Sequence, residues 1–219
     1  MMPLRIVAIS DTHGLHAGLA VPAGDILIHA GDVTMNGDEN DVIAFNAFLG
    51  DLPHPDKIVI AGNHDFCFER DPKHCAGLLP NAIYLLDSAV VLHGLKFYGS
   101  PWQPWFCDWA FNLRRGQPLR EKWDLIPSDT DVLITHGPPQ GIHDFTSDGD
   151  RAGCADLLAA VKRIRPRLHV FGHIHEGWGR TSEMHTTFIN ASICTLDYRP
   201  INPAMVFDCE KDQGNGHGK

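Results

Sequence analysis

Residues 5–14 read RIVAISDTHG, an apolar run that stops at a polar turn. Consecutive β-branched and small apolar residues bounded by turn residues are typical of a buried strand. Asp11 and His13 follow this run directly, and both side chains can bind a metal ion. The segment therefore predicts a buried strand that presents polar ligands at its carboxyl end.

Four later segments have the same form, an apolar run followed by glycine and a polar side chain. They are 25–32, DILIHAGD; 57–65, KIVIAGNHD; 131–137, DVLITHG; and 168–175, LHVFGHIH. In open α/β sheets, ligands bind beyond the carboxyl ends of the strands. Five such ends predict one shared site rather than five separate ones.

The remaining apolar runs and helical periodicities predict the rest of the fold. Strands are expected at 4–9, 25–30, 57–61, 82–86, 89–93, 95–99, 131–135, 168–172, 186–190 and 204–208. Helices are expected at 39–49, with Asp38 as N-cap, and at 153–164, because apolar residues recur there every three or four positions. Strands and helices alternate in the first half of the chain, whereas 82–99 contains consecutive strands. This mixture indicates a layered α/β or α+β sandwich, in which two sheets pack together and helices lie outside.

The ligand types indicate the class of metal. The candidate ligands are Asp11, His13, Asp32, Asn63, His136, His173 and His175. Carboxylate, imidazole and amide ligands without thiolate suit Mn, Fe, Zn, Co or Ni. Seven ligands exceed the need of one ion, and a carboxylate can bridge two ions about 3.5–4 Å apart, so a dinuclear site is expected. An extended backbone at Asp11-x-His13 and His173-x-His175 would point each pair of side chains the same way.

The ordered blocks SDTHG, HAGD, GNHD, THGPP and GHIH resemble the signature blocks of the calcineurin-like metallophosphoesterase superfamily over residues 9–176. The connecting text YGSPWQPWF at 98–106 and INAS at 189–192 is similar to the metallophosphoesterase-domain (MPPED-type) group, which is related to class III cyclic nucleotide phosphodiesterases. The resemblance implies a double β-sandwich flanked by helices.

The resemblance also implies roles for the individual residues. Asp11, His13 and His175 would hold the first metal, and Asn63, His136 and His173 the second. Asp32 would bridge the two divalent ions. His64 would stay free of metal and act as the acid or transition-state donor near the leaving oxygen.

Composition excludes several other classes of protein. The 219 residues carry a formal charge of −9, with 43% hydrophobic and 21% charged residues, so a disordered or fibrous chain is not expected. Nucleic acid is not an expected partner, because duplex binders need clustered Lys and Arg. No apolar stretch is long enough to span a bilayer, and the six scattered cysteines favour the reducing cytoplasm. We expect one domain over 1–210 and a disordered tail at 211–219.

Several residues allow two interpretations. The tryptophans of segment 101–118 could pack the core or contact substrate, and packing is favoured; Arg114 and Arg115 could clamp a phosphate, but a solvated face is favoured. Asp65 could orient the His64 imidazole or cap a turn. Among the other histidines, His29 is expected in the core, and His16 lies close enough in sequence to the first block to touch substrate.

The predicted function is hydrolysis of a phosphodiester, a cyclic nucleotide or a small aryl ester, by direct attack of a metal-bridging hydroxide. The preference for diesters comes from the narrower resemblance. The alternatives are a phosphomonoesterase, nucleotide pyrophosphatase or nuclease on the same site, or a nucleotide-binding regulatory protein with little turnover. The expected partner is a small phosphate ester, in particular a nucleotide, and homo-oligomerisation is left open.

Overall fold

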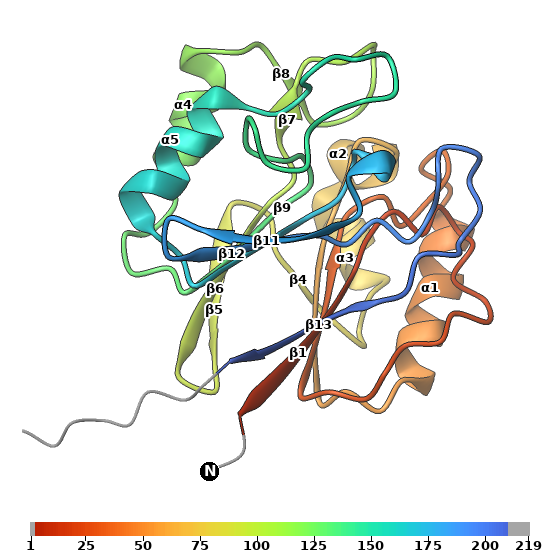
Figure 1. The fold of residues 1–219 in the computed structure, drawn as a ribbon. Helices are drawn as coiled ribbons and strands as arrows, with labels where there is room; N and C mark the ends of the chain where they lie inside the picture. Colours follow the sequence, from red (N-terminus) through yellow and green to blue (C-terminus); the bar gives the residue numbers. More distant parts are fainter. Residues whose placement is uncertain (1–2, 210–219) are drawn as a thin grey trace, which may run out of the picture.

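Two mixed β-sheets face each other in the computed structural model, which describes residues 3–209 (Figure 1). The predicted tail at 211–219 lies outside the described residues. The first sheet has the order β13-β1-β2-β3-β4, with β1 to β4 parallel and β13 antiparallel to β1. Its strands are β1 (Leu4–Ile9), β2 (Ile26–Ala30), β3 (Asp56–Ile60), β4 (Ile83–Tyr84) and β13 (Met205–Cys209).

The second sheet has the order β11-β12-β10-β9-β6-β5, with four parallel inner strands and an antiparallel strand at each edge. Its strands are β5 (Ser88–Leu92), β6 (Leu95–Ser100), β9 (Val132–Thr135), β10 (Leu168–Phe171), β11 (Gly179–Glu183) and β12 (Thr186–Asn190). A separate pair, β7 (Gln103–Pro104) and β8 (Asn112–Leu113), lies in the loop after β6.

Helices cover the outer face of each sheet, on opposite sides of Figure 1. The first sheet packs on α1 (Glu39–Asp51), α2 (Phe66–Arg70) and α3 (Pro72–Gly77), and the second on α4 (Gln117–Trp123) and α5 (Ala155–Ile164). A short 3₁₀ turn, η1 (His175–Gly177), follows β10. The layers are therefore helix, sheet, sheet, helix.

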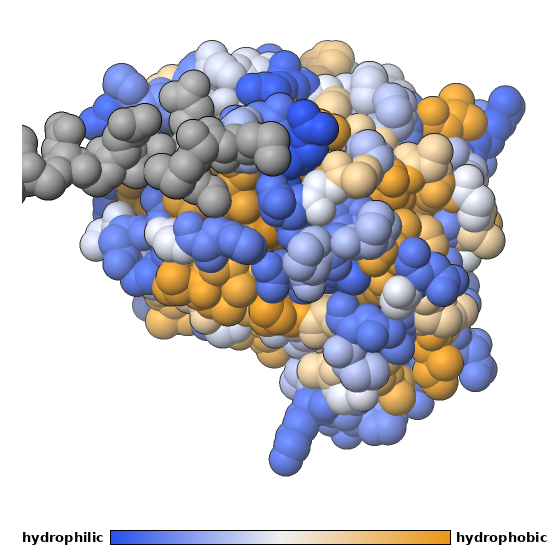
Figure 2. Space-filling view, turned by 90° about the horizontal axis from the view of Figure 1, so that it is seen from below, coloured by the Kyte–Doolittle hydropathy of each residue, from blue (hydrophilic) through white to orange (hydrophobic). Residues whose placement is uncertain are grey.

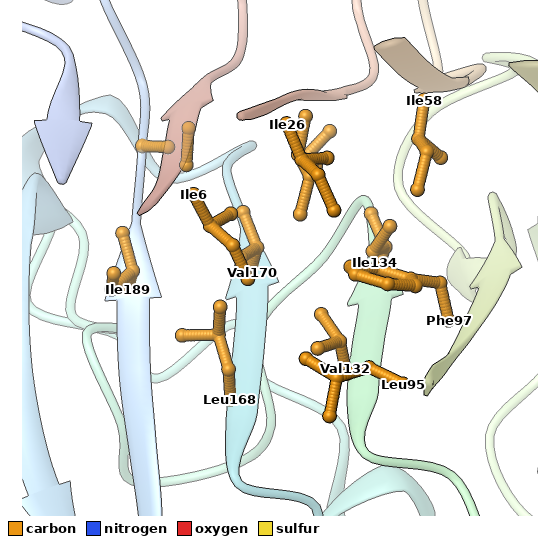
Figure 3. Packing of buried hydrophobic residues seen from close by; sticks show 14 of the residues in the cluster. Ile6, Ile26, Ile58, Leu95, Phe97, Val132, Ile134, Leu168, Val170 and Ile189 are labelled. Atoms are coloured by element: carbon orange, nitrogen blue, oxygen red, sulfur yellow. The ribbon is translucent and has the colours of Figure 1, made fainter. Parts of the chain in front are cut away.

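The alternation of side chains along each strand produces this layering. In β1, Ile6 and Ala8 point into the core between the sheets, whereas Val7 and Ile9 pack under the helices of the first sheet. Figure 3 shows the inner side chains of the two sheets meeting, with Ile6 and Ile26 facing Val170 and Ile134. Apolar burial on both faces explains why these strands read as continuous hydrophobic runs.

The predicted fold class and all ten predicted strands are confirmed, although β4 is only two residues long. Both predicted helices are present, and the Asp38 side chain caps α1 by accepting from Asn40 N. The sequence analysis missed α2, α3 and α4, whose five to seven residues are too short for a clear helical period, and β11. Because β11 is an edge strand and mostly exposed, its polar sequence GRTSE carries no apolar signal.

Among residues 3–209, no helix combines the length and the hydrophobicity needed to cross a bilayer. Figure 2 shows the molecule from below, where polar residues separate the apolar ones into several patches.

Candidate metal centre

All eight side chains predicted for the site lie at one end of the two sheets, seven in loops and His175 at the start of η1. The first sheet supplies Asp11, His13, Asp32, Asn63 and His64, and the second supplies His136, His173 and His175. The sheets join at this end, because Ser10 after β1 pairs with Ser192 after β12. His136 crosses between the sheets and donates from Nδ1 to the Ala30 carbonyl at 3.0 Å.

Asp11, His13 and His175 form the first group of candidate ligands. One ligand atom from each lies within 4.8 Å of the others. The His13 and His175 Nε2 atoms are 3.3 Å apart, and His175 Nε2 is 3.6 Å from Asp11 Oδ1. Atoms at this spacing can share one ion with bonds of about 2.0–2.2 Å.

Asp32 lies between this group and the second one. Its Oδ2 is 3.8 Å from His13 Nε2 and 3.4 Å from His136 Nε2. Asn63 Oδ1 is 2.9 Å from His136 Nε2, and the His173 ring packs against the His136 ring with 5.1 Å between centroids. Asp32 Oδ2 thus lies within 4 Å of one candidate ligand from each group.

His64 faces the same space from the loop after β3. Its Nε2 is 4.0 Å from Asp32 Oδ2, and its Nδ1 donates to the Met35 carbonyl at 2.7 Å. Trp109 lies against the ring, with 4.1 Å between centroids. These contacts leave Nε2 directed toward Asp32.

Backbone carbonyls orient three of the imidazoles in the same manner. His136, His175 and His64 each place Nδ1 at a carbonyl oxygen, of Ala30, Thr195 and Met35 respectively. Such bonds fix the tautomer that leaves Nε2 available for a metal or a proton.

An extended backbone was expected at the site, but the observed backbone is not extended. Asp11, His13, Asp32 and His173 have φ of 55°, 46°, 57° and 66°, in the left-handed region that non-glycine residues rarely occupy. The expectation that extended Asp11-x-His13 and His173-x-His175 tips align their side chains is therefore wrong. Tight turns bring these side chains together, and such strained positions cluster at functional sites.

Glycines next to the ligands allow this close packing. A Cβ on Gly62 would overlap Asp32 Oδ1 and come within 2.6 Å of His136 Cε1, and one on Gly31 would lie 2.5 Å from His136 Nδ1. A Cβ on Gly172 would overlap Asp11 Oδ2. Glycine at these positions therefore lets the candidate ligands lie this close together, and the donor set fits divalent cations.

The electrostatics of the site also favour cations. Burial lowers the pKa of His13 to about 4 and that of His173 to about 3, so both rings are neutral at pH 7 and can bind metal. Burial opposes protonation of His136, yet the neighbouring Asp32 carboxylate raises the pKa of that ring to about 9. Two buried carboxylates thus create a negative potential that bound cations would neutralise.

The chain is similar to a known family and to individual known proteins. The family model for calcineurin-like phosphoesterases matches residues 4–177. The chain belongs to the calcineurin-like phosphoesterase family. Metallophosphoesterase domain-containing protein 1 from Homo sapiens is 48% identical over 229 residues, which cover 93% of this chain and 70% of the relative.

The chain is also similar to a nematode protein and, in fold, to a solved structure. UPF0046 protein C25E10.12 from Caenorhabditis elegans is 44% identical over 227 residues, covering 94% of this chain and 80% of the relative. A solved crystal structure covers 94% of this chain and 99% of its own with a TM-score of 0.68, and its 18% identity makes this a likeness of fold.

In this calcineurin-like phosphoesterase, a pocket of about 480 Å³ opens over the candidate ligands. Trp105, Phe106, Trp109 and Tyr198 line it together with His64. The expectation that the tryptophan segment packs the core is right for Trp102, which lies against Phe111, whereas Trp105 and Trp109 form a pocket wall.

Arg115 is the one Lys or Arg among the residues that line this pocket in the described part of the chain. Its guanidinium donates to the carbonyls of Gly153 and Ala152 at 2.7 and 2.8 Å. Although the Arg115 side chain is exposed, these two hydrogen bonds anchor it at the pocket. The expectation that Arg115 lies only on a solvated face is therefore wrong. Nothing in the structure brings Arg114 to the pocket lining.

Asp65 does not orient the His64 ring. Its carboxylate accepts from Gly62 N, Val33 N, Thr34 N and Thr34 Oγ1 at 2.8–3.1 Å. Asp65 therefore ties the loop after β3 to the loop after β2. This contact fixes the positions of the loops that carry Asp32 and His64.

Two other histidines lie in the core. His29 is fully buried and its Nε2 is 3.0 Å from Thr12 Oγ1. His16 packs against Phe45 and Phe48, and it is not among the pocket-lining residues, so the suggested substrate contact is not seen.

The sequence analysis missed two contributors near the first group. Ser192 Oγ donates to Asp11 Oδ2 at 2.6 Å, and Tyr198 lies edge-on to the His13 ring. Both follow β12. Ser192 ends the INAS segment quoted for the narrower resemblance, which gave it no role, and no pattern near Tyr198 indicates a ligand-binding turn.

Proposed function

We propose that this protein is a metal-dependent phosphodiesterase acting on small esters with an aryl or nucleoside group, cyclic nucleotides included. The observation that carries the proposal is the pocket, which joins the candidate metal ligands to an aromatic wall of Trp105, Phe106, Trp109 and Tyr198. Aromatic side chains pack well on flat rings. The coarser assignment, a phosphoesterase of the calcineurin-like family, rests on the family match.

In the proposed assignment, Asp32 contributes to both metal positions. The first position takes Asp11, His13 and His175, and the second takes Asn63, His136 and His173. The ions would be first-row divalent metals such as Mn, Fe, Zn, Co or Ni, whose preferences these ligands match. Bound divalent ions supply positive charge to the phosphoryl oxygens and acidify the attacking water.

His64 supplies the proton in this proposal. Because Nδ1 donates to the Met35 carbonyl, the transferable proton is the second proton of the imidazolium form, on Nε2, which points toward Asp32 and the floor of the pocket. Trp109 covers one side of the ring and limits its rotation. A proton held at this atom can pass to the leaving oxygen as the P–O bond breaks.

Charge at the pocket mouth favours diesters over monoesters. Asp148, Asp150 and Glu176 line the mouth, and Arg115 is the single Lys or Arg among the described lining residues. A diester carries one negative charge near neutral pH, whereas a monoester or a polyphosphate carries more and is repelled more strongly. The aromatic wall binds an uncharged ring without adding to this repulsion.

The test compares bis(4-nitrophenyl) phosphate with 4-nitrophenyl phosphate, and cyclic with linear nucleotides, in Mn²⁺, Fe²⁺, Co²⁺ and Zn²⁺ with and without chelator. We expect chelator-sensitive turnover with a higher kcat/KM for the diesters. Trp105→Ala should raise KM for the aryl diester, whereas Phe145→Ala, an exposed aromatic outside this pocket, should not. Asp32→Asn should lose metal and activity together.

Two results would contradict the proposal. A higher kcat/KM for monoesters would assign the site to a phosphomonoesterase. Nucleotide binding by calorimetry without turnover in any of the four metals would assign the chain to a regulatory class.

The proposed location is the cytoplasm. Cys67, Cys75, Cys107, Cys154 and Cys194 are free thiols, as expected in a reducing compartment. Fractionation with an antibody to the chain tests this location.

A further inference from the structure

His13 differs from His64, His136 and His175 in how its ring is held. Its side chain is fully buried, yet its Nδ1 has no hydrogen-bond partner within residues 3–209. His136 and His175 are each anchored through Nδ1 to a backbone carbonyl. No hydrogen bond to the described backbone therefore fixes the His13 ring, whose Nε2 lies 3.3 Å from His175 Nε2.

Tyr198, in the loop after β12, packs its ring against the His13 ring and can hold that ring in place. Its ring lies 4.9 Å from the His13 ring at 78°, and 5.7 Å from the His175 ring at 87°. Both are edge-to-face arrangements, the favoured geometry for aromatic pairs. The His64 ring contacts His13 from another direction, with 4.5 Å between centroids.

The loop that carries Tyr198 is itself tied to the first group of ligands. Tyr198 N donates to the Thr195 carbonyl at 2.9 Å, and the same carbonyl accepts from His175 Nδ1 at 3.0 Å. Tyr198 has φ of 55°, a strained conformation that turns the chain here. One tight turn thus holds His175 by hydrogen bonding and His13 by ring packing.

We propose that Tyr198 is a positioning residue for the first metal, acting through the edge of its ring on His13 and through its turn on His175. The proposal rests on the assignment of His13 as a metal ligand under the proposed function. Groups that orient ligands from outside the coordination sphere change metal affinity by about 10- to 100-fold when removed. Tyr198 also lines the pocket, so its role must be separated from substrate contact.

The experiment measures Mn²⁺ binding to chelator-stripped protein by calorimetry, without substrate. For Tyr198→Ala we expect one of two binding events to weaken by about 10- to 100-fold. Tyr198→Phe, which keeps the ring, should stay within about threefold of the unmodified protein on the same scale. Tyr198→Leu should weaken Mn²⁺ binding as Tyr198→Ala does. The larger leucine side chain controls for any loosening of the loop by alanine.

Leu196→Ala is the matched control. Leu196 belongs to the same loop, is 52% exposed and lines the same pocket, but it has no ring to contact the imidazoles. We expect both of its binding events to be unchanged. Urea midpoints of all variants in chelator measure any loss of folding stability separately from the loss of metal affinity.

Wild-type affinity at both positions in Tyr198→Ala and Tyr198→Leu would overturn the inference and leave the proposed function standing. Equal weakening in Tyr198→Phe and Tyr198→Ala would also overturn it, since the hydroxyl would then be the active group. No Mn²⁺ binding to the unmodified protein would overturn the proposed function as well.

Discussion

Replacing Gly62 by alanine should disrupt the second metal position through one methyl group. Gly62 follows β3 and lies against the loop after β2 and the His136 ring. A Cβ at this position would overlap Asp32 Oδ1 and lie 2.5 Å from Asp32 N and 2.6 Å from His136 Cε1. The backbone of Gly62 does not have positive φ, so the effect of the substitution is steric.

The distances set the size of the effect. Ordinary contacts begin near 3.4 Å, so the Asp32 backbone or the His136 ring must move by nearly 1 Å. Overpacking of this kind lowers the free energy of unfolding by about 1–3 kcal/mol. A misplacement of about 1 Å in a catalytic site lowers activity by about 100-fold.

Urea unfolding in chelator measures the stability change, and metal analysis after dialysis measures the loss of metal from the second position. Gly77→Ala is the control, because Gly77 ends α3 and its Cβ would meet nothing within 4 Å. Its metal content should equal that of the unmodified protein, and its free energy of unfolding should be unchanged or higher by up to about 1 kcal/mol. Wild-type stability, metal content and activity in Gly62→Ala would refute the packing argument.

Three further predictions concern single side chains. His64→Ala should lower kcat on bis(4-nitrophenyl) phosphate by about 10²- to 10⁴-fold with both metals retained; unchanged kcat would remove His64 from catalysis. Asp65→Asn should lower the free energy of unfolding by about 1–3 kcal/mol, because an amide cannot accept all the hydrogen bonds of that buried carboxylate, and urea unfolding measures it. Burial lowers the pKa of His169 from 6.5 to about 3. Between these pH values the unfolded chain binds a proton at His169 that the folded chain does not. The free energy of unfolding therefore falls as pH falls from 6.5 toward 3. His169→Gln should reduce the loss of unfolding free energy by roughly 1.4 kcal/mol per pH unit in this range. Unfolding at pH 7.5 and 5.5 measures it. An identical change of unfolding free energy with pH in the variant and the unmodified protein would contradict the prediction.

The strands and their polar ends could be predicted because their signals are local. Continuous apolar runs such as Ile26–Ala30 are buried on both faces and read as strands from composition alone. The short helices α2 and α3 could not be predicted, since tertiary packing against the first sheet stabilises them more than their own sequence does. The edge strand β11 forms through pairing with β12, which its polar residues do not reveal.

The amino-acid sequence by itself determined the layered fold, the residue types at the five strand ends and the family to which the chain is similar. These follow from patterns within about ten residues, where apolar periodicity and turn chemistry are decided. Only the tertiary structure decided how the ligands face one another: left-handed turns at Asp11 and His13, the backbone carbonyls that orient His136 and His175, and the Tyr198 ring against His13. Such contacts join residues up to 185 positions apart, as His13 and Tyr198 are, and they exist only once the two sheets pack together.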